Sequence, residues 1–259
     1  MPAFAANLSM LFNEVDFLDR FQLASEAGFR GVEYLFPYAY EPEQLKQILD
    51  ANNLTQVLFN LPPGDWDAGE RGIACLPDRV EEFRAGVDQA IRYAGVLSCT
   101  QVNCLAGLLP AGLNEDQAWT TLLGNVEYAA QKLAGAGMTL CLEAINSRVD
   151  MPGFFLDTSA RVMQVIESIE ADNVRLQYDV YHMQVMEGDL IRTMECLLPW
   201  IAHVQIADNP GRNQPGTGEI NFTRAFEALD RMGYQGWVGA EYRPAGTTSE
   251  SLDWFRNLA

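Results

Sequence analysis

The chain has 259 residues, of which 48% are hydrophobic and 20% are charged, a composition that supports a sizeable core and excludes a disordered protein. Its 35 acidic residues against 17 basic ones give a formal net charge of −18, which excludes a nucleic-acid partner because phosphate binding needs a basic surface. No apolar run reaches the roughly 20 residues that span a bilayer, and the start of the chain lacks the basic segment of a signal peptide, so we expect a cytoplasmic protein with no membrane partner.

Short apolar runs alternate with amphipathic stretches along the whole chain. In order, they predict a strand at residues 4–10, a helix at 16–27, a strand at 31–36, a helix at 42–51, a strand at 55–61, a helix at 79–94, a strand at 101–106, a helix at 115–133, a strand at 139–145, a helix at 158–169, a strand at 174–180, a helix at 189–197, a strand at 202–207, a helix at 222–231, a strand at 237–242 and a helix at 249–255. The predicted strands are almost continuously apolar, as parallel strands buried on both faces should be.

This alternation indicates parallel βαβ units, and eight of them at this length predict an α/β protein built as a closed (β/α)8 TIM barrel. No Gly-rich linker or charge run divides the sequence, so we expect one catalytic domain over residues 1–259. The longest irregular segments, 61–78 and 208–219, each follow a strand and should therefore lie on the catalytic face of the barrel.

Polar side chains interrupt four successive strands late in the chain. They are Glu143, Asp179, Gln205 and Glu241, and each lies toward the carboxyl end of its strand, where the active sites of barrels form. A buried carboxylate is costly unless it is paired or binds a metal, and three carboxylates with one amide oxygen are a hard donor set suited to Mg²⁺ or Mn²⁺. Structural ion pairs are the alternative for any single member, but four on adjacent strands favour a site.

Loops and strand ends supply candidate substrate ligands. Arg71 and Arg212 are suited to a substrate carboxylate, and the alternative for them is a surface pairing with Glu70 or Asp208. His182 follows the sixth strand and is either a donor to a substrate oxygen or a loop histidine bonded to backbone. Three asparagines that end strands are further candidates: Asn7, Asn60 and Asn103.

Three other polar residues are expected to support the fold. His203 lies two residues before Gln205 and so points to the same side of that strand, but deeper, as a core or supporting group. Glu33 and Asp208 are expected to form structural pairs or loop anchors. The glycine-rich stretch at 216–218 does not directly follow a strand, which excludes a dinucleotide site.

A resemblance to a known family rests on several stretches taken together. They are ANLSMLF at 6–12, GFRGVEYLFPY at 28–38, NLPPGDWDAGERGIACLP at 60–77, AINS at 144–147, QYDVYHMQ at 177–184, HVQIADNPGRNQPGTGEIN at 203–221 and GWVGAEYRP at 236–244. The chain resembles the hydroxypyruvate isomerases of the xylose-isomerase-like barrel superfamily over nearly its whole length.

The resemblance implies a (β/α)8 fold and a set of site residues. It implies that Glu143 and Glu241 are the catalytic glutamates, and that a divalent metal, Mg²⁺ or Mn²⁺, is held by Glu143, Asp179, Gln205 and Glu241. The epimerase relatives usually have a histidine where this chain has Gln205. An amide oxygen is the weaker ligand, so we expect a metal that is weakly bound or not strictly required.

The implied activity converts hydroxypyruvate and tartronate semialdehyde into each other by proton transfer through an enediolate. Glu143 and Glu241 would move the proton, while Arg71 and Arg212 hold the carboxylate of a small anionic substrate and His182 donates to an oxygen. The alternatives are an isomerase of a four-carbon 2-oxo sugar acid, a ketose 3-epimerase, a dehydratase of the same superfamily, and a non-catalytic binding barrel. A zinc-dependent DNA-repair nuclease is disfavoured by the two histidines and the net charge of −18. A homo-oligomer is left open.

Overall fold

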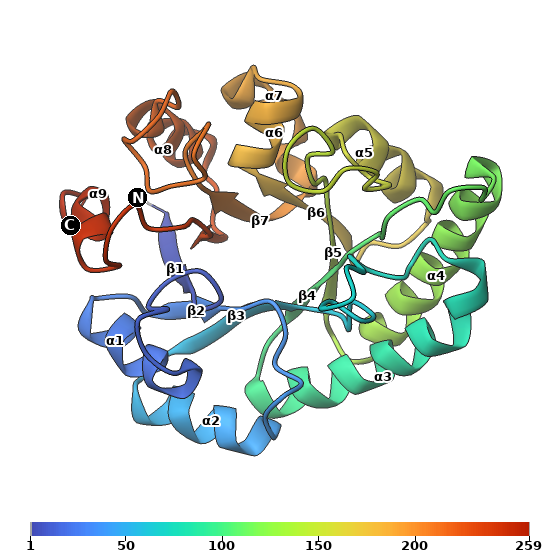
Figure 1. Cartoon of the computed structure of the whole chain (residues 1–259), viewed down its shortest axis with the longest axis horizontal. Helices are drawn as coiled ribbons and strands as arrows, with labels where there is room; N and C mark the ends of the chain where they lie inside the picture. Colours follow the sequence, from blue (N-terminus) through green and yellow to red (C-terminus); the bar gives the residue numbers. More distant parts are fainter. Residues whose placement is uncertain (1, 259) are drawn as a thin grey trace.

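The computed structural model describes residues 2–258, and its parallel strands close into a barrel in which β8 pairs with β1 (Figure 1). The strands are β1 (Ala3–Asn7), β2 (Gly31–Glu33), β3 (Thr55–Asn60), β4 (Gln101–Cys104), β5 (Thr139–Glu143), β6 (Val174–Asp179), β7 (Ile201–Ile206) and β8 (Trp237–Ala240). The closed ring of eight strands in sequence order confirms the predicted (β/α)8 barrel.

Helices surround the barrel and connect each strand to the next (Figure 1). They are α1 (Arg20–Glu26), α2 (Pro42–Ala51), α3 (Val80–Leu97), α4 (Glu115–Gly135), α5 (Ser159–Ser168), α6 (Val180–Met186), α7 (Leu190–Leu197), α8 (Phe222–Met232) and α9 (Asp253–Arg256), with 3-10 turns η1 (Phe17–Asp19), η2 (Pro77–Arg79), η3 (Leu198–Trp200) and η4 (Glu250–Leu252). Each longer helix buries one face; in α8 the buried residues are Phe222, Ala225, Phe226, Ala228 and Leu229, at the spacing of an amphipathic helix.

Several predicted strands extend too far at their carboxyl ends. β2 ends at Glu33, although the apolar sequence continues to Phe36, and β8 ends at Ala240, two residues before its predicted end. The residues just past these ends, Tyr34 and Tyr242, are still buried, because the loops continue the core after strand pairing has stopped. An apolar pattern reports burial, so it cannot mark the last paired residue.

Helix α6 was not predicted. It begins at Val180, directly after β6, and Asp179 caps it by accepting the backbone N–H of His182 at 3.0 Å. Its first residues are apolar and read as a continuation of the strand. The placement of His182 in a loop was therefore wrong: the residue lies in the first turn of a helix.

The two ends of the described chain pack against each other. Phe4 of β1 meets Trp254 and Phe255 of α9 edge-on, with ring centroids 5.3 and 5.9 Å apart. This contact covers the seam where β1 pairs with β8. None of the described helices is both long and apolar enough to cross a membrane.

Candidate active site

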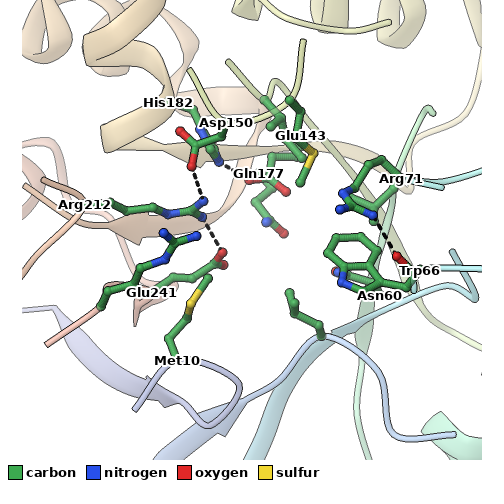
Figure 2. A pocket seen from close by; sticks show the side chains of 15 residues that line it. Met10, Asn60, Trp66, Arg71, Glu143, Asp150, Gln177, His182, Arg212 and Glu241 are labelled. Carbon is green, nitrogen blue, oxygen red and sulfur yellow. Dashed lines mark hydrogen bonds and ion pairs between the residues drawn. The ribbon is translucent and has the colours of Figure 1, made fainter. Parts of the chain in front are cut away.

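A cavity of about 250 Å³ lies among the residues that end the strands and begin the following loops (Figure 2). Six of the residues predicted from the sequence line it: Asn60, Arg71, Glu143, His182, Arg212 and Glu241. The other four predicted residues contact a lining residue without lining the cavity themselves: Asn7, Asn103, Asp179 and Gln205. The structure thus brings all ten together around one space.

Glu143, the last residue of β5, faces the cavity (Figure 2). Its Oε2 accepts a hydrogen bond from Nδ2 of Asn103, on the neighbouring strand β4, at 3.0 Å. Burial, together with the charges of Glu241 and Asp179, raises the pKa of Glu143 well above its ordinary value. The group therefore holds a proton more firmly than an exposed glutamate does.

Glu241 directly follows β8 and faces the same cavity. Its Oε1 accepts from Nη2 of Arg212 at 2.7 Å, and its Oε2 accepts from Nδ2 of Asn7 at 3.3 Å and from Nε2 of Gln205. Burial raises the pKa of Glu241 to about 8, although Arg212 opposes the shift. The cavity therefore contains two carboxyl groups that hold a proton to a higher pH than an exposed glutamate does.

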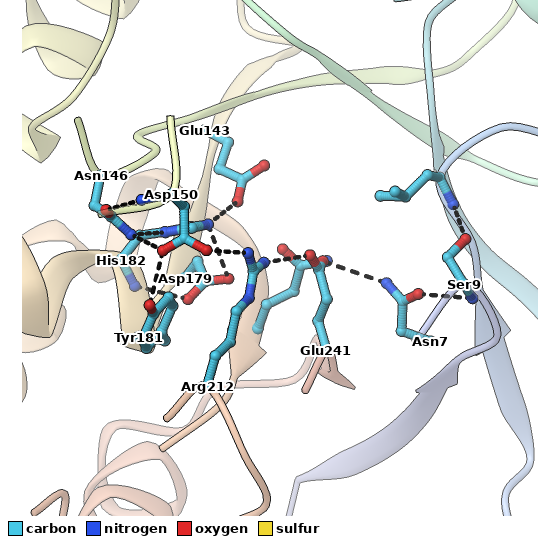
Figure 3. A network of polar contacts seen from close by, with 12 residues as sticks. Asn7, Ser9, Glu143, Asn146, Asp150, Asp179, Tyr181, His182, Arg212 and Glu241 are labelled. Atoms are coloured by element: carbon cyan, nitrogen blue, oxygen red, sulfur yellow. Dashed lines mark hydrogen bonds and ion pairs between the residues drawn. The ribbon is translucent and has the colours of Figure 1, made fainter. Parts of the chain in front are cut away.

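Asp179 and His182 form a third part of the site (Figure 3). Oδ1 of Asp179 caps α6, whereas its Oδ2 is buried without a hydrogen-bond partner in the described part of the chain. Nε2 of His182 lies 3.9 Å from this Oδ2 and 3.9 Å from Oε1 of Glu143. Burial lowers the pKa of His182 to about 4, so the imidazole is neutral at physiological pH.

The charge of this region suits a cation. Ligand atoms of Glu143, Asp179 and His182 all lie within 4.8 Å of one another. The carboxylates outnumber the single guanidinium of Arg212 among them, and one buried oxygen of Asp179 has no donor. Buried carboxylates in this state are usually neutralised by protons or by a metal, so the residues fit a divalent ion.

Gln205 is placed differently from its predicted role. Its Oε1 accepts from Nε2 of Gln177 at 2.6 Å, while its Nε2 donates to Oε1 of Glu33 at 2.7 Å and to Oε2 of Glu241. The nitrogen, not the oxygen, faces the carboxylates. In this arrangement Gln205 bridges Glu33 and Glu241 and does not offer an oxygen to a metal.

Beneath Gln205, two fully buried groups form a pair. Nε2 of His203 lies 2.6 Å from Oε2 of Glu33. Gly239 on β8 leaves the room for this pair, because a Cβ there would overlap the carboxylate of Glu33. The structural roles predicted for Glu33 and His203 agree with this placement. Asp208 anchors its own loop, as expected, by accepting the backbone N–H groups of Gly216, Gly218 and Ile220.

Arg212 is already neutralised by the protein. Its Nη1 lies 3.0 Å from Oδ1 of Asp150 and its Nη2 lies 2.7 Å from Oε1 of Glu241. Burial opposes the charge, but these carboxylates and Asp179 raise the pKa of Arg212 above its ordinary value. The alternative pairing with Asp208 is absent, since that side chain binds its own loop.

Arg71 has no such partner. Its guanidinium lies over the ring of Trp66, 4.1 Å from the ring centre, and donates to the carbonyl oxygens of Trp66 and Glu70 at 3.0 and 2.7 Å. The side chain of Glu70 binds Arg79 instead. Within residues 2–258 no carboxylate forms an ion pair with Arg71, which faces the cavity (Figure 2).

Sequence reasoning missed some lining residues, among them Trp66, Asp150 and Gln177. Gln177 could have been found, because it lies two residues before Asp179 and therefore points to the same side of β6. Asp150 and its neighbour Asn146 lie in the loop after β5, where no periodic pattern indicates which side chains turn inward.

Comparison with known proteins assigns the barrel to a family. Residues 21–258 match the family model described as the xylose isomerase-like TIM barrel. The chain belongs to this family. Among its relatives, hydroxypyruvate isomerase of Escherichia coli (strain K12) is 51% identical over 254 residues, covering 98% of each chain. A 2-oxo-tetronate isomerase of Cupriavidus necator is 46% identical over 256 residues, covering 99% of this chain and 98% of the other.

Solved structures include further members of this barrel type. One described as an AP endonuclease, family 2, from Brucella melitensis superposes with a TM-score of 0.97 at 47% identity, covering 99% of each chain. A 3-keto-D-glucoside 4-epimerase from Escherichia coli superposes with a TM-score of 0.80 at 22% identity, covering 99% of this chain and 98% of the other. The second likeness shows the shared fold.

Proposed function

We propose that this xylose isomerase-like barrel is a hydroxypyruvate isomerase, which interconverts hydroxypyruvate and tartronate semialdehyde. The observation that carries the proposal is the pair of buried carboxyl groups, Glu143 and Glu241, which face one small cavity with raised pKa values. A relative with this activity in its name is 51% identical over nearly the full chain.

The pair suits a proton shift between neighbouring carbons. One carboxylate removes a proton from the hydroxymethyl carbon, C3, which leaves an enediolate. The other carboxyl group returns a proton to C2, while the hydroxyl proton passes from O3 to O2, so that the atoms balance. A carboxyl group with a raised pKa serves as base when ionised and as acid when protonated, which are the two roles these steps require.

The substrate carboxylate is assigned to Arg71. This guanidinium faces the cavity and lacks a carboxylate partner within residues 2–258, whereas Arg212 already binds Asp150 and Glu241. We therefore assign Arg212 to holding Glu241 in place and to the oxygens of the substrate nearest to it. Asn60 lines the cavity and is a further candidate donor.

A divalent metal, Mg²⁺ or Mn²⁺, would be held by Glu143, Asp179 and Glu241, and it would stabilise the charge of the enediolate when bound. The fourth predicted ligand, Gln205, joins this set only if its side-chain amide rotates by half a turn.

Titration of metal-stripped protein with Mn²⁺ by calorimetry tests the metal site. Asp179→Asn should bind Mn²⁺ at least ~10-fold more weakly, because it removes a negative charge while keeping an oxygen to cap α6. Equal affinity in both forms would rule out this site.

Proton NMR of hydroxypyruvate in D₂O tests the function. The protein, supplied with Mg²⁺ or Mn²⁺, should produce tartronate semialdehyde and exchange a C3 hydrogen with solvent. Glu143→Gln and Glu241→Gln should each lower kcat by at least ~10²-fold, the smaller contribution of general acid–base catalysis. The proposal fails if neither conversion nor exchange depends on the protein.

A second candidate substrate is a 2-oxo-tetronate, since a relative named for that activity is 46% identical to this chain. Parallel assays of the two 2-oxo acids at equal enzyme concentration identify the preferred substrate as the one with the larger kcat/KM. A nuclease activity, which the name of the Brucella structure suggests, is disfavoured by the net charge of −18.

A further inference from the structure

Asn146 is a fully buried residue of the loop after β5, with a side chain whose orientation is settled by its partners (Figure 3). Its Oδ1 lies 2.9 Å from the backbone nitrogens of both Val149 and Asp150. Backbone N–H groups can only donate, so the atom they meet must be the amide oxygen. The amide nitrogen therefore points the opposite way.

The two hydrogens of Asn146 Nδ2 have one acceptor each. Nδ2 lies 2.7 Å from Oδ2 of Asp150 and 2.7 Å from Nδ1 of His182. The carboxylate of Asp150 also accepts from Tyr181 and Arg212. It is therefore an acceptor in all of these contacts, and Asn146 Nδ2 is the donor to it. Nδ1 of His182 must then accept a hydrogen bond, and a ring nitrogen that accepts has no proton.

Because Nδ1 accepts a hydrogen bond and has no proton, the ring proton of His182 is on Nε2. This nitrogen points toward the cavity side of the ring, 3.9 Å from oxygens of Glu143 and Asp179 and beyond hydrogen-bonding distance of either. The structure describes no hydrogen-bond partner for Nε2 among residues 2–258. An N–H donor is thus left available between the catalytic carboxylate and the expected cation.

We propose that Asn146 is a positioning residue that fixes His182 as an Nε2–H donor to the substrate oxygen, and that this prevents His182 from acting as a metal ligand. A metal needs the lone pair of Nε2, which the proton occupies. The identity of the oxygen rests on the proposed isomerase function. The tautomer rests only on the hydrogen bonds of Asn146.

The tautomer is measurable directly, because the chain has two histidines. In ¹⁵N NMR of protein labelled at histidine nitrogens, protonated and unprotonated ring nitrogens are well separated. His182→Gln assigns the signals by removing one set. We expect an unprotonated Nδ1 and a protonated Nε2 for His182 in the wild-type protein. A proton on Nδ1 overturns the proposal, whatever the enzyme proves to catalyse.

Asn146→Asp tests the cause. It replaces the donor to Nδ1 with an acceptor, so the proton of His182 should move to Nδ1 and the lone pair to Nε2. Loss of the donor should lower kcat by roughly 10²–10³-fold, as loss of one oxyanion donor does, with a smaller change in KM. Mn²⁺ should bind more tightly, since Nε2 can now act as a ligand.

Asp150→Asn is the matched control. It changes the charge of the same cluster but leaves the Asn146 amide, so the protonated nitrogen of His182 should stay Nε2. The signals of His203, on β7, should not move in either variant. If Asn146→Asp folds and His182 keeps its proton on Nε2, Asn146 only supports the loop and the proposal is wrong.

Discussion

Arg71 and Arg212 differ in the number of anions that already surround each guanidinium. Arg212 touches two carboxylates of the protein, while Arg71 is held by carbonyl oxygens and an aromatic ring. A cation that is already paired gains little from a further carboxylate, whereas an unpaired one in a partly enclosed cavity gains a charge-assisted hydrogen bond. Replacing each arginine with alanine should therefore change a different kinetic constant.

Arg71→Ala should raise KM for hydroxypyruvate by ~10-fold or more, the loss expected for a charge-assisted hydrogen bond, and change turnover of neutral dihydroxyacetone little. Arg212→Ala should lower kcat for both substrates, because it releases Glu241 from its 2.7 Å contact. Steady-state kinetics on the two substrates separate these outcomes. Equal loss on both substrates in Arg71→Ala would show that this arginine does not bind the carboxylate.

At the same scale, the sequence predicted the residues of the site better than their roles. Glu143 and Glu241 were recognisable because a carboxylate in an apolar strand needs a special reason. The role of Gln205 depends on which end of its amide faces Glu241, and that is decided by Gln177 and Glu33, from two other strands. No pattern within one strand contains this information.

The loop between β3 and α3 is the element that positions Arg71. Its backbone docks on the segment after β4, where the N–H of Cys75 donates to the carbonyl of Ala106 at 2.9 Å. Gly72, next to Arg71, has a φ of +104°, and a Cβ there would overlap the carbonyl of Leu105. The close approach of the two loops therefore requires a glycine at this position.

Gly72→Ala should raise KM for hydroxypyruvate several-fold and destabilise the fold by about 1 kcal/mol or more, since both the backbone angle and the contact resist a side chain. Gly69→Ala is the matched control in the same loop, with a φ of +97° but no atom within 4 Å of the added Cβ. It should lose stability and keep its KM. Urea titration measures the stability of both variants, and steady-state kinetics measure their KM values. Equal KM values would mean that the contact between the two loops does not position Arg71.

At the scale of the whole molecule, the site lowers the stability of the fold in a defined pH range. The pKa of Glu241 rises from 4.5 to about 8 and that of Glu143 rises well above 4.5, mainly through burial. Between pH 4.5 and about pH 8, the folded protein binds more protons at these carboxyl groups than the unfolded chain does. Its free energy of unfolding therefore falls as the pH rises through this range. Carboxyl groups with lowered pKa values, such as Glu70 and Asp150, change the free energy of unfolding only at lower pH.

Metal-stripped protein should therefore melt at a lower temperature at about pH 8 than at about pH 5.5. Glu143→Gln should flatten this dependence and raise Tm at the higher pH, because it removes a buried group that must ionise. Glu219→Gln is the control: this exposed carboxyl has a pKa lowered by hydrogen bonds from Gln184 and Asn209. Calorimetric scans at both pH values measure Tm. An unchanged dependence of Tm on pH in Glu143→Gln would contradict this prediction.

The barrel itself followed from the sequence because buried parallel strands must be apolar throughout, which makes them visible as runs. Two irregularities in strand pairing were not visible. The register shifts between Val32 and Glu33 of β2, opposite the unpaired Val57 of β3, and between Leu176 and Gln177 of β6, opposite the unpaired Ala202 of β7. Both shifts come directly before a polar side chain that reaches the centre of the barrel. Each shift adds one apolar residue to the facing strand and leaves the apolar pattern intact, so composition cannot reveal it.

Glu143 ends β5 and Glu241 directly follows β8. These strands are not neighbours in the barrel, and no hydrogen bond joins the two side chains within the described residues (Figure 2). A hydrogen taken by one of them therefore cannot be handed back by the other. If each acts once per turnover, the one deuterium that is removed from a dideuterated C3 passes to water, the other stays on the aldehyde carbon, and C2 of the product receives its hydrogen from the solvent. The product of dideuterated hydroxypyruvate in ordinary water would thus carry deuterium on the aldehyde carbon and none on C2.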